Sequence, residues 1–385
     1  MFSFISNHSG KHARRVFFAF ARHVLLPAAG LFLLTLCVAC AASGPAENGA
    51  ASAAAQKDRN TLTVLCVDFP EYDWTRSIIG AANSSRPASA SQDKSAKKIV
   101  VQLLNTAGAD MHSYQPTIAD MVKIANCDLL IYNGGASQFW VEDALKAYPN
   151  PDRQVLSLMR LFESEPDRFP TYVQDEDEHE HEEHAHAHSH GEHDHEDETD
   201  EHLWLSLKMS REFCRAATSQ LAALNPAAAA AYQANAAAYI KKIDALDDKI
   251  TKLVRQSTCK TLIFADRYPF KYFCDDYGLA HEAAFPGCSA ETEASFETII
   301  SLADDLKALP KSRLVTLDGG SAALAETITR AAELPETQIV TLYSMQSLPQ
   351  TIRTLRESGK IQNEREVTYL YLMEQNYESL ARLLS

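Results

Sequence analysis

Six short runs of mainly apolar residues constrain the fold of this 385-residue chain more than any other feature. Each run is apolar at consecutive rather than alternate positions, which is typical of parallel strands covered by helices on both faces. The runs form one group before residue 160 and another after residue 258, and they comprise 62–67, 99–104, 129–132, 262–264, 314–317 and 339–342. The chain is therefore predicted to be an α/β protein with two lobes, each built on its own parallel sheet.

A long helical pattern separates the two groups of strands. Apolar residues recur at spacings of three and four from Tyr232 to Leu253, which spans roughly 30 Å at ~1.5 Å per residue. Asn225 and Pro226 suit the N-cap and the first helical position. We expect a single spine helix over 225–257 that joins an N-terminal lobe, 61–224, to a C-terminal lobe, 258–385, with a cleft between them. A second amphipathic helix is expected over 367–384.

Residues 1–40 have the pattern of a secretory signal peptide rather than of a folded element. The apolar run 24–39 is short for a membrane span and follows a basic segment, although an uncleaved anchor helix is the alternative. The run ends in Leu36-Cys37-Val38-Ala39-Cys40, which resembles the site at which bacterial lipoproteins are cut and acylated. We expect lipid on Cys40, with Cys37 as the competing position. Residues 41–60 are expected to form a flexible tether, which gives an extracytoplasmic, membrane-anchored protein.

The remaining cysteines do not indicate a structural zinc site. They are irregularly spaced and contain no CxxC pair, so buried thiols or one disulfide are the expected alternatives. These residues are Cys66, Cys127, Cys214, Cys259, Cys274 and Cys288.

One acidic segment accounts for most of the net charge of −15, because Asp175 to Glu201 carries many carboxylates and no Lys or Arg. The chain lacks the basic face that nucleic-acid binding requires. The low-complexity loop 174–201 also holds eight histidines, and imidazole is a common ligand for zinc, copper and nickel. A solvated acidic loop is the alternative, but this density favours an auxiliary metal collector. The eight are His179, His181, His184, His186, His188, His190, His193 and His195.

A tight metal site is expected in rigid structure, at the carboxyl ends of the strands. The run Gly108-Ala109-Asp110-Met111-His112-Ser113-Tyr114-Gln115-Pro116-Thr117 and the run Asp200-Glu201-His202-Leu203-Trp204-Leu205-Ser206 carry a resemblance. They are similar to the metal signatures of the solute-binding lipoproteins of zinc and manganese ABC importers, known as cluster A-I. The second run follows the histidine-rich loop directly, as in the zinc-specific branch. The resemblance extends from about Thr61 to the end of the chain.

The resemblance implies a set of metal ligands. His112 and His202 would come from the N-terminal lobe, whereas the third family ligand, in F-H-D-x-Y, is replaced here by Phe264-Ala265-Asp266-Arg267-Tyr268. Asp266 is the best substitute, with Arg267 as its partner or competitor, and a simple ion pair between them is the alternative. Asp318 is the candidate fourth ligand, with a turn or helix-start role as the alternative. We expect His281 to be structural.

The resemblance further implies a binding protein and no enzyme. The expected function is capture of Zn(II) and its delivery to an ABC permease and its ATPase by a monomeric receptor. Mn(II) is the alternative cargo, although the additional imidazoles favour zinc. A zinc hydrolase is an alternative from another class, but the chain has neither an HExxH nor a GxSxG motif. An adhesin or surface metal buffer is the third possibility.

Overall fold

The computed structural model describes residues 60–80, 95–106, 110–163, 200–285, 294–346 and 348–385. Several predictions fall outside these ranges and stay predictions. They concern the signal peptide, the lipidated Cys40, the tether, residues 174–199 of the histidine-rich loop, and Cys288.

The first sheet has four parallel strands in the order β2-β1-β3-β4. Val64 and Cys66 face one side of this sheet, Leu65 faces the other, and all three are fully buried, as expected for a strand covered by helices on both faces. The strands are β1 (Thr61–Cys66), β2 (Lys98–Leu103), β3 (Leu129–Tyr132) and β4 (Gln154–Ser157).

The second sheet repeats this arrangement in the order β6-β5-β7-β8, also parallel throughout. Its strands are β5 (Thr261–Arg267), β6 (Ala280–Phe285), β7 (Arg313–Leu317) and β8 (Gln338–Leu342). The register of β5 on β6 shifts between Phe264 and Arg267, at the carboxyl end of β5. These two sheets confirm the predicted α/β fold with two lobes.

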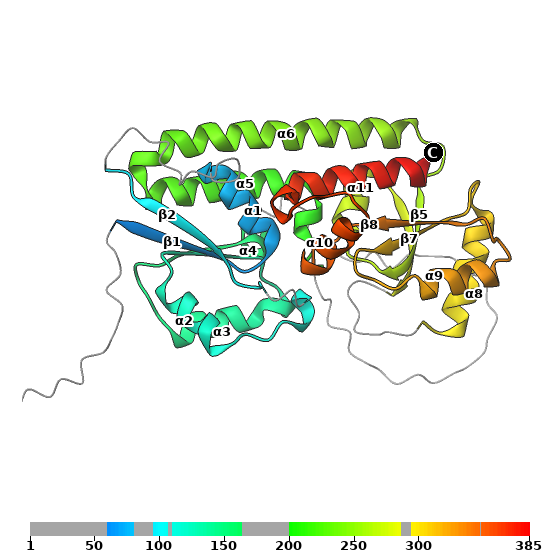
Figure 1. The fold of residues 1–385 in the computed structure, drawn as a ribbon, viewed down its shortest axis with the longest axis horizontal. Helices are drawn as coiled ribbons and strands as arrows, with labels where there is room; N and C mark the ends of the chain where they lie inside the picture. Colours follow the sequence, from blue (N-terminus) through cyan, green and yellow to red (C-terminus); the bar gives the residue numbers. More distant parts are fainter. Residues whose placement is uncertain (1–59, 81–94, 107–109, 164–199, 286–293, 347) are drawn as a thin grey trace, which may run out of the picture. The chain divides into compact units, whose positions relative to one another are not determined.

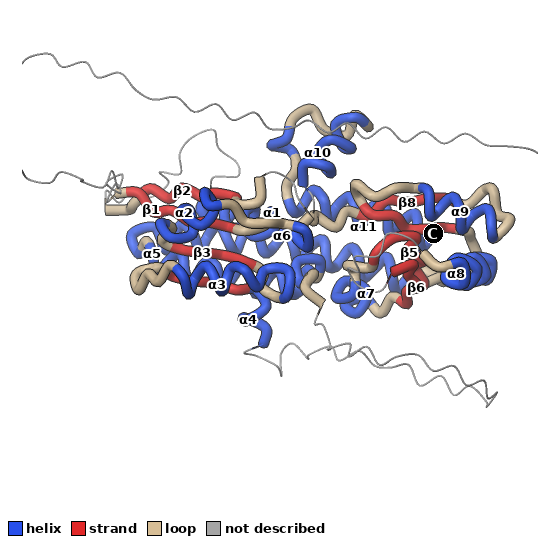
Figure 2. The backbone as a smooth tube through the Cα atoms, turned by 90° about the horizontal axis from the view of Figure 1, so that it is seen from below, coloured by secondary structure: helices blue, strands red, loops and turns tan. Residues whose placement is uncertain are grey.

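Helices cover both sheets (Figures 1 and 2). In the N-terminal half they are α1 (Phe69–Ile79), α2 (Ile118–Asn126), α3 (Phe139–Ala147), α4 (Leu158–Glu163) and α5 (Leu207–Leu224). They continue with α6 (Ala229–Gln256), α7 (Lys271–Tyr277), α8 (Phe296–Ala308), α9 (Ala323–Ala331), α10 (Leu348–Glu357) and α11 (Tyr369–Leu384). No helix in these described ranges has both the length and the apolar character needed to cross a membrane.

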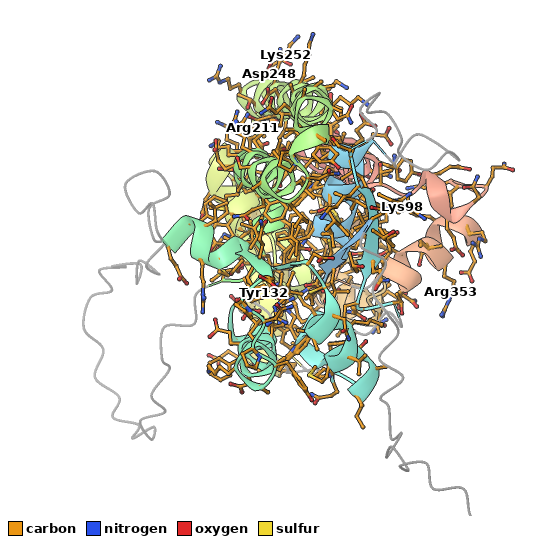
Figure 3. The ribbon with its side chains drawn as sticks, turned by 90° about the vertical axis from the view of Figure 1, so that its left-hand side faces the viewer. Lys98, Tyr132, Arg211, Asp248, Lys252 and Arg353 are labelled. Carbon is orange, nitrogen blue, oxygen red and sulfur yellow. The ribbon has the colours of Figure 1, made fainter. Side chains whose placement is uncertain are left out.

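The spine helix is α6, which packs on α1 and α5 of the first lobe and on α7 and α11 of the second (Figure 1). Tyr232, Tyr239 and Ile250 lie on its buried face, as its periodicity predicts. Arg211 of α5 holds the two helices together from the polar side, because its guanidinium pairs with Asp244 and Asp247 of α6 (Figure 3).

The start of the spine differs from the prediction. Asn225 precedes a 3-10 turn, Pro226–Ala228, and its side chain makes no capping bond. That side chain instead bonds the backbone of Lys97 in both directions and the hydroxyl of Tyr232, so it ties the start of the spine to the start of β2.

The two lobes also share one hydrophobic core. A single cluster of buried side chains continues from Val64 and Trp74 of the first lobe, through α5 and α6, to Phe264 and Leu372 of the second. At the seam, the side chain of Asp73 in α1 accepts the backbone N–H of Tyr369, the first residue of α11. The spine is therefore reinforced by a second helix that contacts both lobes.

Candidate metal centre

His112 sits in a short turn fixed by its neighbours. It lies in the 3-10 turn Met111–Ser113, where Asp110 Oδ1 accepts the backbone N–H of His112 at 3.0 Å. The following segment ends in a capping box at the start of α2, in which Thr117 and Asp120 exchange side-chain and backbone hydrogen bonds. Asp120 also accepts the hydroxyl of Tyr114. The hydrogen bonds within this run thus hold the imidazole of His112 in place.

His202 is held in a similar way, two residues after Asp200. Asp200 Oδ1 accepts the backbone N–H of His202 at 2.8 Å and lies 2.9 Å from its ring Nδ1. The hydroxyl of Tyr272, on α7 of the second lobe, donates to the backbone carbonyl of Asp200 at 2.8 Å. Because the carboxylate accepts the Nδ1 proton, the Nε2 lone pair of His202 is left to face the site.

The structure brings the two predicted histidines together. Their Nε2 atoms are 3.3 Å apart, although the residues are 90 positions apart in the chain. His112 Nδ1 lies 2.5 Å from Ser137 Oγ on the far side of the ring. The His202 side chain is 2% exposed and that of His112 is 20% exposed, so solvent reaches the pair from the His112 side.

Glu201 packs behind the pair and explains the Asn-Gly-Gly run after β3. Its Oε1 accepts the backbone N–H of Ser137 at 2.9 Å, and its backbone carbonyl accepts the side chain of Asn133 at 2.8 Å. A Cβ on Gly135 would lie 2.5 Å from Glu201 Oε1, and Gly135 has a φ of 84°. Only glycine allows this close approach without strain.

Gln346, from the loop after β8, is the third side chain at the site and was not predicted. Its amide nitrogen lies 3.0 Å from Nε2 of His112 and 2.9 Å from Nε2 of His202. This loop is fixed by Trp204, whose indole N–H donates to the backbone carbonyl of Ser344 at 2.9 Å. The amide therefore lies within hydrogen-bond distance of both imidazoles.

The nitrogens of His112, His202 and Gln346 form a triangle with sides of 3.3, 3.0 and 2.9 Å. Ligand atoms ~2.0–2.1 Å from a tetrahedral zinc ion lie about 3.3–3.4 Å from one another, so the two imidazole nitrogens have this spacing. The amide nitrogen of Gln346 lies at hydrogen-bond distance from both of them. An ion bonded to both imidazoles would see them at an angle of about 105–110°.

The two predicted carboxylate ligands do not join this triangle. Asp266 Oδ1 accepts the N–H of Arg267, and its Oδ2 accepts the N–H of Leu317 at 3.1 Å, so it fastens β5 to the end of β7. In the described part of the chain, no third His, Cys, Asp or Glu joins the histidine pair in a group that could hold a metal.

Asp318 is committed to the loop that carries Gln346. It is buried, and it accepts the N–H and hydroxyl of Ser344 and the hydroxyl of Thr351. Burial raises the pKa of its carboxyl, and the hydrogen bonds from Thr351 and Ser344 only partly oppose that rise. Its carboxylate is thus engaged by the loop, and its role as a fourth ligand stays a prediction.

A cavity of about 360 Å³ opens beside the triangle. Arg267 and Asp110 both line this cavity and form an ion pair, in which Nη2 of Arg267 lies 3.1 Å from Oδ2 of Asp110. Its lining also includes Asp266, Asp318, Gly319, Gly320, Ser344, Gln346 and Gln350. His281 lies elsewhere, as expected, and its ring stacks on Tyr268 at 3.8 Å between centroids.

Comparison with known proteins identifies the family of this chain. Residues 90–383 match the family described as zinc-uptake complex component A, periplasmic, or ZnuA. The chain is 24% identical over 358 residues to the high-affinity zinc uptake system protein ZnuA of Bacillus subtilis, covering 91% of this chain and 96% of that protein. It is 25% identical over 271 residues to the zinc-binding lipoprotein AdcA of Streptococcus pneumoniae serotype 4, covering 70% of this chain. This chain spans only 48% of the length of AdcA.

Solved structures share the fold. The Zn(II)-bound ZnuA-like domain of Streptococcus pneumoniae AdcA has a TM-score of 0.60 and 21% identity, covering 84% of this chain and 99% of that one. The periplasmic zinc binding protein TroA of Treponema pallidum has a TM-score of 0.61 and 18% identity, with the same coverage. The resemblance seen in the sequence is therefore confirmed, and this chain belongs to the ZnuA family of periplasmic zinc-uptake components.

Proposed function

We propose that this protein is an extracytoplasmic receptor that captures Zn(II) and delivers it to an ABC-type import permease. The observation that carries the proposal is the pair of His112 and His202, whose Nε2 atoms lie 3.3 Å apart, the spacing of two ligands on a tetrahedral zinc ion. Membership of the family supports the cargo and bears out the expectation of a binding protein rather than an enzyme. An ATPase partner, a monomeric state and lipid anchoring at Cys40 are parts of the same proposal.

We assign the ligands as follows. Zinc binds Nε2 of His112 and of His202, and Gln346 turns its amide so that Oε1 replaces the nitrogen. That torsion is broad and roughly two-fold, so the turn is inexpensive. Asp266 stays the proposed carboxylate, because it lines the adjoining cavity, and it must give up its bond to Leu317 to coordinate. Two imidazoles favour zinc over manganese, which prefers oxygen ligands.

A zinc titration of the full chain in detergent, in competition with a chelator of known affinity, tests the assignment. We expect His112→Ala and His202→Ala each to weaken the tight site by about 1,000-fold or more, since each removes a direct ligand. His281→Ala is the matched control and should bind like the wild type. The proposal fails if the tight site survives His112→Ala combined with His202→Ala.

The histidine-rich loop is tested in the same titration. Deletion of residues 174–199 should remove weaker sites and leave the tight one. The deletion must stop before Asp200, because that residue orients His202. If deleting the loop abolishes tight zinc binding while the double alanine variant still binds zinc tightly, the principal site lies in the loop instead.

A further inference from the structure

Arg267 lies beside the metal centre, at the end of β5, where the register of that strand shifts. Its backbone N–H is held by Asp266 Oδ1 at 2.9 Å. Its guanidinium reaches Asp110 of the other lobe, with Nη2 3.1 Å from Oδ2. The contact joins residues 157 positions apart, so it is a product of the fold.

Asp110 uses its two oxygens differently. Oδ1 accepts the backbone N–H of His112, and Oδ2 pairs with Arg267. The same carboxylate therefore fixes the turn of a zinc ligand and binds the cation of the opposite lobe. The two side chains are 31% and 24% exposed, which is too buried for full screening by water.

Among the described residues that line the cavity, Arg267 alone carries a positive charge. Three aspartates, Asp110, Asp266 and Asp318, supply the negative charges. This surplus of carboxylates attracts a divalent cation, whereas the guanidinium repels it and stays charged at every relevant pH.

We propose that Arg267 is a release residue, whose fixed positive charge beside the histidine pair weakens zinc binding and speeds zinc dissociation. The inference rests on the proposed function, because a receptor that hands on its cargo must also let go of it. The carboxylate of Asp110 acts in the opposite direction. Arg267 therefore sets how readily the site exchanges its metal, although Arg267 itself does not bind the metal.

Stopped-flow dissociation of zinc from the full chain in detergent, started with excess chelator, tests this role. Arg267→Met keeps the aliphatic stem and removes the charge, so we expect dissociation about tenfold slower and affinity about tenfold higher. Arg267→Lys keeps the charge and should stay within about threefold of the wild type. Arg353→Met, on the outer surface of α10 (Figure 3), is the control for loss of a remote charge.

Asp110→Asn separates the charge effect from the loss of the ion pair. Its amide oxygen still accepts the His112 N–H, but the pair is broken and the attractive charge is gone. A charge mechanism predicts that Asp110→Asn weakens zinc binding while Arg267→Met strengthens it. A structural latch predicts weaker binding in both variants, and that outcome would overturn the inference, as would an Arg267→Met variant that matches the wild type.

Salt gives a further readout. The affinity gap between Arg267→Met and the wild type should shrink as salt rises from about 0.05 to 0.5 M, because screening weakens the repulsion. A gap independent of salt contradicts the charge mechanism. His112→Ala in the same assay tests the proposed function itself, which fails if this variant still binds zinc tightly. If His112→Ala loses tight zinc binding but Arg267→Met behaves like the wild type, only this inference fails.

Discussion

Both histidines follow, by two positions, an aspartate that accepts their backbone N–H. This repeated local device makes each imidazole a fixed part of a short turn, so its position depends little on the rest of the chain. Because each turn is local, the resemblance of its short sequence run was enough to predict His112 and His202. Gln346 is different, because it reaches them from 234 and 144 positions away and an amide gives no titratable or metal-binding signal of its own.

Trp204 offers a test at the scale of one residue. Trp204→Phe removes the N–H that holds the carbonyl of Ser344, and we expect a loss of about 1–3 kcal/mol in the free energy of unfolding, since a buried carbonyl loses its donor. Zinc affinity should fall as well, because the Gln346 loop is less fixed. Urea unfolding and the zinc titration measure the two effects.

Trp140→Phe is the matched control for that change. The Trp140 indole N–H has no hydrogen-bond partner among the residues that the structure describes, so the same truncation there removes no bond seen in them. If the two variants lose the same stability and zinc affinity, the hydrogen bond to Ser344 has no special role.

At the scale of elements, the helices α6 and α11 and the strands β1, β2, β3, β5, β7 and β8 follow from the sequence, whereas the edge strands β4 and β6 do not. Strand β4 has only four residues, with a polar residue at each end, and the first three residues of β6 are exposed. Neither strand therefore has the run of consecutive apolar residues that marks β1 or β3. Edge strands are covered on fewer sides and need fewer apolar residues. Asp266 and Asp318 stay predicted ligands, and sequence reasoning did not anticipate that backbone N–H groups of Leu317 and Ser344 engage their carboxylates.

Helix α1 carries an unusual group of buried acids. Burial raises the pKa of Asp73 to about 6, although the hydrogen bond from the N–H of Tyr369 partly opposes that rise. Burial also raises the pKa of Asp68 to about 7. The pKa of Glu71 is also well above its ordinary value, because the side chain is fully buried. Each of these carboxyls therefore keeps its proton to a higher pH in the folded protein than in the unfolded chain.

This predicts a pH dependence of stability with a definite sign. Below about pH 4, Asp73 is protonated both folded and unfolded, whereas between pH 4 and 6 only the folded state keeps the proton, so rising pH favours unfolding. Asp73→Asn should therefore gain stability relative to the wild type across this window, by up to about 3 kcal/mol. Urea unfolding at pH 4 and pH 7 measures it, with the exposed Asp248→Asn (Figure 3) as the control for net charge. A difference that is the same at both pH values would contradict the assignment.

At the scale of the whole molecule, the lobes are joined by more than the predicted spine. The shared core and the contact of Asp73 with Tyr369 oppose wide opening of the lobes. We therefore expect metal binding to shift loops and to rock the lobes slightly rather than to hinge them apart.

Hydrogen exchange with and without zinc tests this expectation. Added zinc should increase protection in residues 110–117, 200–206 and 343–350, because these segments hold or adjoin the ligands. Amides along the middle of α6 should exchange at unchanged rates. Faster exchange there on adding zinc would reveal a hinge within the helix.

The continuous core has a consequence for dissecting or recombining this protein. Because α6 and α11 bury apolar side chains of both lobes, a cut within the spine leaves each half with a large uncovered apolar face. The halves are not autonomous modules and should aggregate when produced separately. A chimaera that takes one lobe from a relative will fold only if the facing surfaces of both helices are exchanged with it.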